Sequence, residues 1–459
     1  MDLTLGDVAE ALDVDLIHGH SIPVKKVSTD SRTLRNGMLF FALRGEHFDG
    51  HDFVDEVLDK GACGAVVDKE WVSARHQGKG EMLLPVEDPL RALQDVASHY
   101  RKKFRFPVIA VTGTNGKTTT KEMISAVLKD RYRVMKSPGN LNNHIGLALS
   151  VCDWDEDGEI AVVEMGTNHF GEIRRLCEIA RPTHGVITNI GKGHLEFFGD
   201  LRGVAQAKAE LLEFLEGGVA ILNGDDPYLL PLKNIAGRTM TYGLSEGCDF
   251  RGSDLGIDTF GFPGVLVNGM TVKIRISGRH NLYNGLAAMA VGRIFEVSWD
   301  KICEALESYR PLEKRMEVLR LSGITILNDA YNANPTSVRE ALVTLKSIKV
   351  GRRRIAVLGD MLELGESSRV EHRNVGEWIV ELDMDGFFGY GPGMEVATAR
   401  AKKLGLEKIG HFESKGDLVE ALHHSLEEDD VVLVKGSRGM RMEEIVEGLQ
   451  KRLSSENQG

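Results

Sequence analysis

Short apolar runs alternate with longer amphipathic stretches through the middle of the chain. Each run is four or five residues long, and the runs are 108–112, 160–164, 185–189 and 219–222. Buried strands separated by helical segments are typical of a parallel sheet with crossover connections. The pattern therefore predicts a parallel α/β domain, with an antiparallel insertion at 249–276, where glycine and β-branched residues are frequent.

The same alternation starts again after Pro311. The expected strands are 324–328, 354–358, 386–389 and 431–435, and the clearest helices are 337–348 and 416–425. The N-terminal part mixes short strands and helices, and it closes with an amphipathic helix at 88–103. We therefore predict an α/β protein of three domains: residues 1–106, a central domain with a P-loop-type parallel sheet at 107–311, and a C-terminal Rossmann-like domain at 312–459.

Composition and charge limit the partners of this protein. Hydrophobic residues make up 42% of the 459 positions and charged residues 27%, as in a globular protein in water. The formal net charge of −12 disfavours non-specific binding of nucleic acid or of an anionic membrane. No apolar stretch nears the roughly 20 residues that span a bilayer, and the acidic N-terminus lacks the features of a secretion signal. We expect a cytoplasmic protein without membrane insertion, whose five cysteines, none of them in a CxxC pair, stay reduced.

A glycine-rich turn follows the first strand of the central domain. The strand leads into Gly113-Thr114-Asn115-Gly116-Lys117-Thr118-Thr119, and a helix with one apolar face begins at Lys117. This order points backbone N–H groups and a helix N-terminus at one spot, which suits a polyphosphate. Lys117 would neutralise the phosphates and the Thr118 hydroxyl would ligate Mg²⁺. The sequence therefore predicts an ATP-using enzyme. The loop departs from the general phosphate-loop pattern G-x-x-x-x-G-K-[ST] at one position: the pattern places its first glycine at position 111, which is Val111 here, and this loop has its glycine at Gly113.

Chemically active side chains follow two later strands. Glu164 ends the run 160–164, and His194 comes shortly after the run 185–189. Ligands of open α/β sheets bind at the carboxyl ends of the strands, so Glu164 fits as a ligand of the Mg²⁺ that accompanies ATP. A single histidine in a loop is more often a structural hydrogen-bonding residue. From its spacing on a predicted helix, Lys208 is expected on a solvated face, without a functional role.

Polar residues gather again at the start of the last domain. Asn332-Ala333-Asn334-Pro335 precedes the helix 337–348, and Arg315 and Asp329 are near it in sequence. These residues either cap the helix or bind a ligand, and the sequence leaves both interpretations open. Lys435-Gly436-Ser437-Arg438 follows another strand and is a candidate for a second anion-binding turn.

Together these motifs resemble the Mur ligases and the folylpolyglutamate synthetases. Their phosphate loop is shortened, which accounts for the missing glycine at Val111. The resemblance covers nearly the whole chain: Asp30-Ser31-Arg32 and residues 37–43 resemble the uridine-nucleotide domain of these ligases, and residues 139–143 and 164–166 resemble their central domain. The stretches that narrow the resemblance to the member adding D-alanyl-D-alanine are 328–335, 359–365 and 435–441.

The resemblance implies a catalytic centre of Lys117, Glu164, His194 and Lys208. Thr118 and Glu164 would ligate one Mg²⁺, and Glu164 and His194 would share a second. Lys208 matches the lysine that is carbamylated in many of these enzymes, and its carbamate would act as an acidic ligand near the second metal. For Lys208 the resemblance therefore contradicts the interpretation based on spacing.

The resemblance also implies binding roles. Residues 113–119 would hold the ATP phosphates, Asn281 and Arg315 would contact the nucleotide, and Asp329 would reach its ribose. The positions implied to face the other substrate are Ser31 and Arg32 for the UDP-sugar, and Asn140, Thr167 and Asn168 for the muramoyl-peptide.

The implied reaction is the ATP-driven formation of an amide bond for peptidoglycan synthesis. The terminal carboxylate of UDP-N-acetylmuramoyl-tripeptide attacks the γ-phosphate, and the amine of D-alanyl-D-alanine then attacks the acyl phosphate. The last domain, which would bind the amine substrate, is expected to close over the ATP site of a monomer about the connector 309–315. The alternatives are a sister ligase that adds a single amino acid, to this precursor or to folate, and an ATP-driven switch without ligase activity.

Overall fold

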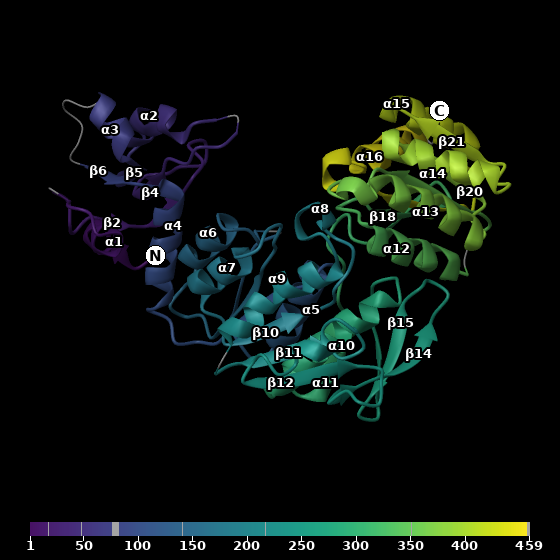
Figure 1. The fold of residues 1–459 in the computed structure, drawn as a ribbon, viewed down its shortest axis with the longest axis horizontal. Helices are drawn as coiled ribbons and strands as arrows, with labels where there is room; N and C mark the ends of the chain where they lie inside the picture. Colours follow the sequence, from purple (N-terminus) through teal and green to yellow (C-terminus); the bar gives the residue numbers. More distant parts are fainter. Residues whose placement is uncertain are drawn as a thin grey trace. The chain divides into compact units, whose positions relative to one another are not determined.

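The computed structural model describes residues 1–16, 18–46, 48–75, 82–139, 141–215, 217–349 and 351–456. They form two compact units, in which helices alternate with strands that are mostly parallel (Figure 1). The first unit comprises residues 1–112, 131–185 and 210–219, and the second comprises 113–130, 186–209 and 220–459. None of the helices in the described ranges combines the length and the apolar composition needed to cross a lipid bilayer.

A four-stranded parallel sheet with the order β3-β4-β5-β6 forms most of the N-terminal part of the first unit. Its helices α2 and α3 pack on the sheet through a core that includes Phe40, Val57 and Val67 (Figure 1). Helix α4 is capped by the Asp88 carboxylate, which accepts from the N–H groups of Leu90 and Arg91. The elements are β1 (Leu3–Thr4), α1 (Leu5–Leu12), β2 (Pro23–Val24), β3 (Lys26–Ser28), β4 (Met38–Phe41), α2 (Val54–Asp59), β5 (Gly64–Asp68), α3 (Lys69–Arg75), β6 (Leu83–Val86) and α4 (Pro89–Arg101).

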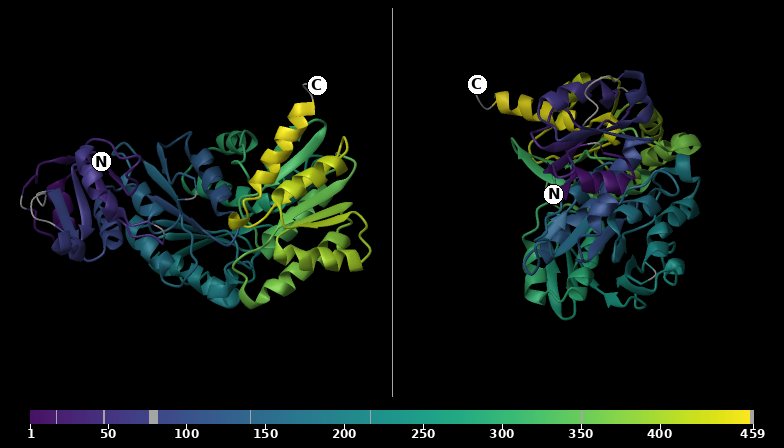
Figure 2. Two further views of the ribbon diagram at one scale, coloured as in Figure 1. Left: turned by 90° about the horizontal axis from the view of Figure 1, so that it is seen from above. Right: turned by 90° about the vertical axis from the view of Figure 1, so that its left-hand side faces the viewer.

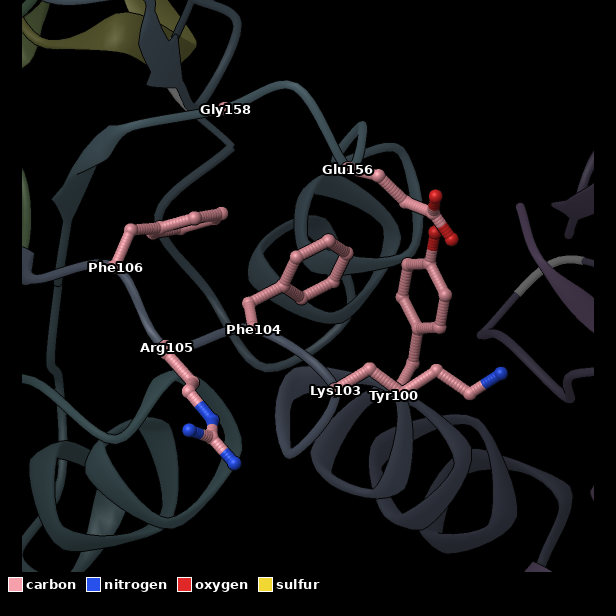
Figure 3. Close-up of a pocket in the computed structure, with 7 residues that line it drawn as sticks. All are labelled: Tyr100, Lys103, Phe104, Arg105, Phe106, Glu156 and Gly158. Atoms are coloured by element: carbon pink, nitrogen blue, oxygen red, sulfur yellow. The ribbon is translucent and has the colours of Figure 1, made fainter.

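A cavity of about 370 Å³ lies beside the end of α4. Its lining residues are Tyr100, Lys103, Phe104, Arg105, Phe106, Glu156 and Gly158, and the aromatic rings form much of its wall (Figure 3). The neighbouring Arg101 is buried, and its guanidinium donates to the carbonyls of Ala180 and Phe104 at 2.8 and 2.7 Å. The residues that the sequence predicts for catalysis or binding are not among those that line this cavity.

The central sheet has seven strands in the order β13-β12-β11-β10-β7-β9-β8. The four apolar runs predicted as strands are confirmed, but the third ends at Ile187, two residues earlier than expected. The strands are β7 (Val108–Thr112), β8 (Val134–Lys136), β9 (Ile160–Glu164), β10 (His184–Ile187), β11 (Val219–Asn223), β12 (Arg238–Gly243) and β13 (Phe250–Arg251). The helices along this stretch of chain are α5 (Lys117–Leu128), α6 (Gly146–Cys152), α7 (Glu172–Ala180), α8 (Leu195–Phe198), α9 (Leu201–Phe214), α10 (His280–Ile294) and α11 (Trp299–Glu307).

The predicted antiparallel insertion is a three-stranded sheet of β14 (Ser253–Ile257), β15 (Pro263–Val267) and β16 (Met270–Lys273). Residues 250 and 251 were also predicted to belong to this insertion. They form β13, which pairs in parallel with β12 of the central sheet.

The last part of the second unit contains a six-stranded sheet with the order β17-β18-β22-β19-β20-β21. Only its edge strand β17 is antiparallel, and helices cover both faces (Figure 2). On one face, Leu418 and Ile445 of the helices α15 and α16 pack against Ile326 and Val434. The Rossmann-like architecture predicted for this stretch is therefore confirmed. The elements are β17 (Glu317–Leu321), β18 (Ile324–Asp329), α12 (Pro335–Ser347), β19 (Arg354–Gly359), α13 (Ser368–Glu381), β20 (Gly386–Tyr390), α14 (Pro392–Lys403), β21 (Ile409–Phe412), α15 (Lys415–Ser425), β22 (Val431–Lys435) and α16 (Glu443–Glu456).

Candidate active site

The loop between β7 and α5 requires glycine at two positions. Gly113 has φ +145°, and a Cβ atom there would lie 1.9 Å from Oγ1 of Thr188. Gly116 precedes the first residue of α5 with φ +79°, and a Cβ atom there would lie 2.5 Å from Oδ1 of Asn284. A side chain at either position would displace these neighbours, so both glycines of the predicted phosphate loop are required by its geometry.

Polar residues just beyond β10 hold this loop in place. The Thr188 hydroxyl donates to the carbonyl of Asn115 at 2.6 Å. The Asn189 side chain accepts from the N–H of Asn115 and donates to its carbonyl, both at 3.0 Å, and the Asn189 carbonyl accepts from the N–H of Thr114. These hydrogen bonds join the phosphate loop to the two residues that directly follow the end of β10 at Ile187.

The ammonium group of Lys117 lies over the loop. It donates to the carbonyls of Gly113 and Thr114 at 2.9 and 3.1 Å. Lys117 is the first residue of α5, and Gly116 offers no side chain to cap the helix. The N–H groups of a first helical turn have no partner within the helix, and the helix dipole adds positive potential there. A cation and a helix N-terminus beside a glycine loop form a site suited to a phosphate chain.

Thr118 and Thr119 follow in the first turn of α5, and both side chains are buried. No three His, Cys, Asp or Glu side chains in the described ranges gather as a ready-made set of metal ligands.

His194 stands before α8 with the left-handed φ of +54°. Its Nδ1 lies 2.5 Å from Oε2 of Glu363. The contact is close but bent, since within the described residues Nδ1 has no hydrogen-bond partner of good geometry. The contact with His194 lowers the pKa of the Glu363 carboxyl, although partial burial opposes this shift. His194 therefore contacts a carboxylate in the stretch 359–365. That stretch was noted in the sequence because it narrows the family resemblance, not because of any contact with His194.

Lys208 is buried in α9, with 3% of its surface exposed. Burial, and secondarily the charge of Lys117, lower the pKa of Lys208 well below its usual value. Within the described part of the chain no carboxylate pairs with it. The interpretation of Lys208 as a solvated surface residue was therefore wrong. It failed because residues on both sides of it in α9, among them Ala205, Ala207 and Leu211, are buried as well, which the spacing of apolar residues alone did not reveal.

The three residues expected at the nucleotide are engaged with their neighbours. Asn281 is 2% exposed, and its amide donates to the carbonyl of Ser277 while its Oδ1 accepts from Asn284. The guanidinium carbon of Arg315 lies 3.8 Å from the centre of the Tyr331 ring. Asp329 accepts from Lys435 at 2.6 Å and from the N–H of Met316 at 3.1 Å. Their contact with a nucleotide stays a prediction.

Of the two interpretations of the polar turn 332–335, the structure confirms helix capping, and ligand binding stays a prediction. Oδ1 of Asn334 accepts from the N–H of Ser337 at 2.9 Å and caps α12. The amide of the same residue donates to Oδ1 of Asn115 in the phosphate loop at 2.8 Å. In the candidate second anion-binding turn, 435–438, the ammonium group of Lys435 donates to Asp329 and to the carbonyl of Asn332.

Glu164 lies in the first unit, at the carboxyl end of β9. It is 1% exposed, and its Oε1 accepts from the amide of Asn142 at 2.7 Å. Thr167 follows in a turn where its hydroxyl donates to Glu172, and the side chain of Asn168 is exposed. The structure thus confirms that Glu164 ends a strand, while its role as a ligand stays a prediction.

The remaining predicted substrate positions include the pair Ser31 and Arg32. Ser31 is largely buried, whereas Arg32 is exposed and its guanidinium donates to both oxygens of Asp30 at 2.9 and 2.8 Å. These hydrogen bonds lower the pKa of Asp30 to about 2. Asn140 lies outside the described residues.

Comparison with known proteins places the chain among characterised relatives. Three family models match it in succession: Mur ligase family, catalytic domain, at residues 23–101; Mur ligase middle domain at 111–292; and Mur ligase, glutamate ligase domain, at 314–438. The UDP-N-acetylmuramoyl-tripeptide–D-alanyl-D-alanine ligase of Bacillus subtilis is 39% identical over 95% of this chain and 93% of its own length. The chain belongs to the Mur ligase family.

Solved structures of Mur ligases resemble this one over their whole length. MurF from Acinetobacter baumannii superposes with a TM-score of 0.89 at 29% identity, covering 98% of this chain and 99% of its own. MurF from Thermotoga maritima, determined in complex with ADP, gives a TM-score of 0.84 at 30% identity over 94% of this chain and 99% of its own.

Several residues of this Mur ligase site were missed by sequence reasoning. Thr188, Asn189 and Asn284 fix the phosphate loop, and Glu363 contacts His194. Two polar residues closing an apolar run were a usable signal for Thr188 and Asn189, because such residues mark the carboxyl end of a strand. No local signal pairs Glu363 with His194, since 169 positions separate them along the chain (363 − 194).

Proposed function

We propose that this chain joins D-alanyl-D-alanine to UDP-N-acetylmuramoyl-tripeptide at the expense of ATP, giving the pentapeptide precursor of peptidoglycan. The observation that carries the proposal is the phosphate loop, with its two required glycines and the Lys117 ammonium over them. The near full-length similarity to a ligase of that name supports the choice of substrates. The ADP complex of the Thermotoga relative supports ATP as the energy source.

The reaction proceeds in two balanced steps. A carboxylate oxygen of the tripeptide attacks the γ-phosphorus of ATP, the bond to the bridging oxygen breaks, and ADP leaves. The amine nitrogen of D-alanyl-D-alanine then attacks the acyl carbon, the nitrogen loses a proton, and inorganic phosphate leaves as the amide forms. Acyl phosphates hydrolyse readily, so the site must exclude water after the first step.

The first step brings a carboxylate to a triphosphate, and positive charge must offset their repulsion. Lys117 and the N-terminal turn of α5 supply it, because both are fixed by the loop before substrate arrives. We assign residues 113–119 to the phosphates, Asn281 and Arg315 to the nucleotide, and Asp329 to its ribose. Ser31, Arg32, Asn140, Thr167 and Asn168 are assigned to the muramoyl substrate.

Two ions of Mg²⁺ are part of the proposal, and the donors suit a hard cation. Thr118 offers a hydroxyl in the first turn of α5, and Glu164 offers a buried carboxylate at a strand end. We assign Thr118, Glu164 and His194 as ligands. When bound, Mg²⁺ would neutralise phosphate charge.

Lys208 fits the chemistry of carbamylation. A lysine nitrogen attacks CO₂ only as the neutral amine, and burial favours that form of Lys208. The nitrogen bonds to the carbon of CO₂ and loses a proton, which leaves an anionic carbamate. That group would serve as a further metal ligand.

The domain boundaries at 106 and 311 remain part of the proposal, and the ranges matched by the three family models are compatible with them. We also propose a monomer that works in the cytoplasm, where ATP and nucleotide-linked sugars are made. Size-exclusion chromatography with light scattering tests the monomer.

The decisive experiment is a substrate panel in an ATP-dependent phosphate-release assay. Wild-type protein is supplied with UDP-N-acetylmuramoyl-tripeptide containing lysine or diaminopimelate, and with D-alanyl-D-alanine, single amino acids, or glutamate with folate. We expect phosphate release and a new amide with D-alanyl-D-alanine. Activity confined to single amino acids or to folate with glutamate would identify a sister ligase instead. Slow ATP turnover that no amine accelerates would identify an ATP-driven switch.

A further inference from the structure

The segment 188–194 lies between the phosphate loop and the helices that follow β18 in the second unit. On one side, the N–H of Gly191 donates to Oγ1 of Thr114 at 2.9 Å. On the other, the N–H of Lys192 donates to Oγ1 of Thr336 in α12 at 3.2 Å. A Cβ atom on Gly193 would lie 2.8 Å from Cγ2 of Thr114, so the segment packs tightly on the loop. A shift of the segment 188–194 would therefore move His194 and the phosphate loop as well.

One ion pair links this segment to α13. Nζ of Lys192 donates to Oε1 of Glu371 at 2.6 Å. Glu371 is 4% exposed, and its other oxygen accepts from the amide of Asn374 at 3.3 Å. Among the described residues Lys192 supplies the only cation paired with Glu371. A buried carboxylate is costly unless it is paired, so removal of Lys192 would leave the charge of Glu371 uncompensated. The Lys192 side chain is 41% exposed, and its ammonium group is directed to Glu371 by this pair.

The pair is one of several polar links between the loops 113–119 and 188–194 and the part of the chain after residue 311. The others include the amide contact of Asn115 with Asn334, the hydrogen bond from the N–H of Lys192 to Thr336, and the contact of His194 with Glu363. The Lys192–Glu371 pair joins opposite charges with good hydrogen-bond geometry and a buried carboxylate. Neither residue was predicted from the sequence to have a role.

We propose that Glu371 is a positioning residue for the ligation reaction: through Lys192 it holds residues 191–194 against the phosphate loop. Glu371 acts through the segment that it fixes. The inference rests on the proposed function, because it names a further residue of the same ATP site. It also ties the ATP site to the part of the chain that we assign to the amine substrate.

Steady-state kinetics and hydrogen exchange test the role of Glu371. Glu371→Gln keeps the shape of the side chain and removes its charge. We expect kcat to fall by about 10- to 100-fold, since small misplacements of reacting groups cost this much, with KM for D-alanyl-D-alanine unchanged. Glu371→Asp should restore part of kcat. The amides of Gly191, Lys192 and Gly193 should exchange faster in Glu371→Gln than in the wild type.

Glu377→Gln is the matched control. Glu377 lies in the same helix and pairs with Arg400 at 2.8 Å, without contacting the segment 188–194. This variant should leave kcat and the exchange of the three amides unchanged. If it lowers kcat and speeds the exchange of the three amides as Glu371→Gln does, the effect is general loosening of α13 and the proposal is wrong.

A double-mutant cycle separates action through Lys192 from independent effects. In the Lys192→Met background, adding Glu371→Gln should change kcat little. Effects that multiply would overturn the proposal, and so would wild-type activity in Lys192→Met. The exchange experiment needs no amine substrate, so an inactive wild type in the substrate panel would refute the proposed function without deciding this inference.

Discussion

Lys117 and Lys208 belong to the same unit of the molecule, yet their amines meet opposite environments. Lys117 lies at the edge of the phosphate loop, where the carbonyls of Gly113 and Thr114 accept from its ammonium group. Lys208 is buried in α9, and within the described residues no carboxylate neutralises it. Burial and the charge of Lys117 together favour the neutral amine of Lys208.

The difference indicates two kinds of chemistry from one type of side chain. In the proposed function, the lysine held by carbonyls would serve as a cation for phosphate. The lysine deprived of water would serve as a nucleophile toward CO₂ and would become an anion afterwards. The two sites are coupled, because the positive charge of Lys117 is one reason for the lowered pKa of Lys208.

The largest effect should come from Lys117→Met. We expect kcat/KM for ligation to fall by about 10³-fold, because the variant removes a preorganised cation from the phosphate site. The free energy of unfolding should change little, since the side chain is partly exposed and its partners are loop carbonyls. Lys301→Met is the control, because Lys301 pairs with Asp130 and Glu304 on the exposed face of α11 and should tolerate the change. Equal losses in both variants would contradict a special role for Lys117.

Lys208→Ala should lower kcat by about 10²-fold, the loss expected when a fixed charge is removed from the reaction site. A short-chain acid such as acetate should restore part of the activity, since its carboxylate can occupy the space left by the carbamate. The same acid should not rescue Lys117→Met. Full activity of Lys208→Ala without the acid would rule out the carbamate.

The two lysines also mark what the sequence can and cannot predict. The phosphate loop is a local pattern, in which Gly113 and Lys117 are four positions apart, so strand, loop and helix were all correctly predicted. Burial of Lys208 depends on which elements cover α9, and spacing along one helix does not contain that information. The contacts of His194 with Glu363 and of Lys192 with Glu371 join distant segments, so only the folded chain reveals them.

Gly113→Ala tests whether the phosphate loop needs its glycine to bind ATP. Its methyl group would meet Oγ1 of Thr188 at 1.9 Å, which forces the loop or the end of β10 to move. We expect a loss of about 1–3 kcal/mol in the free energy of unfolding, as for other overpacked sites, together with weaker binding of ATP. Gly247→Ala is the control, because a Cβ atom there meets no neighbour within 4 Å. Calorimetry of ATP binding and urea unfolding measure both effects, and an unchanged affinity for ATP in Gly113→Ala would show that the loop does not bind phosphate.

The smallest expected effect is the change that Lys208 makes in the pH dependence of the unfolding free energy, measured in bicarbonate-free buffer. The pKa of Lys208 is lower in the folded chain than in the unfolded chain, where it is near its usual value of 10.5. Between these two values the unfolded chain holds a proton that the folded chain lacks, so this residue makes the unfolding free energy rise with pH. The destabilisation is complete below the folded pKa and disappears as the pH approaches 10.5.

Lys208→Met removes this burden at neutral pH, so its Tm should exceed that of the wild type by roughly 2–4 °C, the shift that about 1 kcal/mol produces in a unit of this size. The gap should close as the pH is raised toward 10.5. Adding bicarbonate should raise the Tm of the wild type and leave that of Lys208→Met unchanged, because only the lysine can bind CO₂. A gap that stays constant across this pH range would mean that Lys208 keeps its proton in the folded chain, and the contrast between the two lysines would fail.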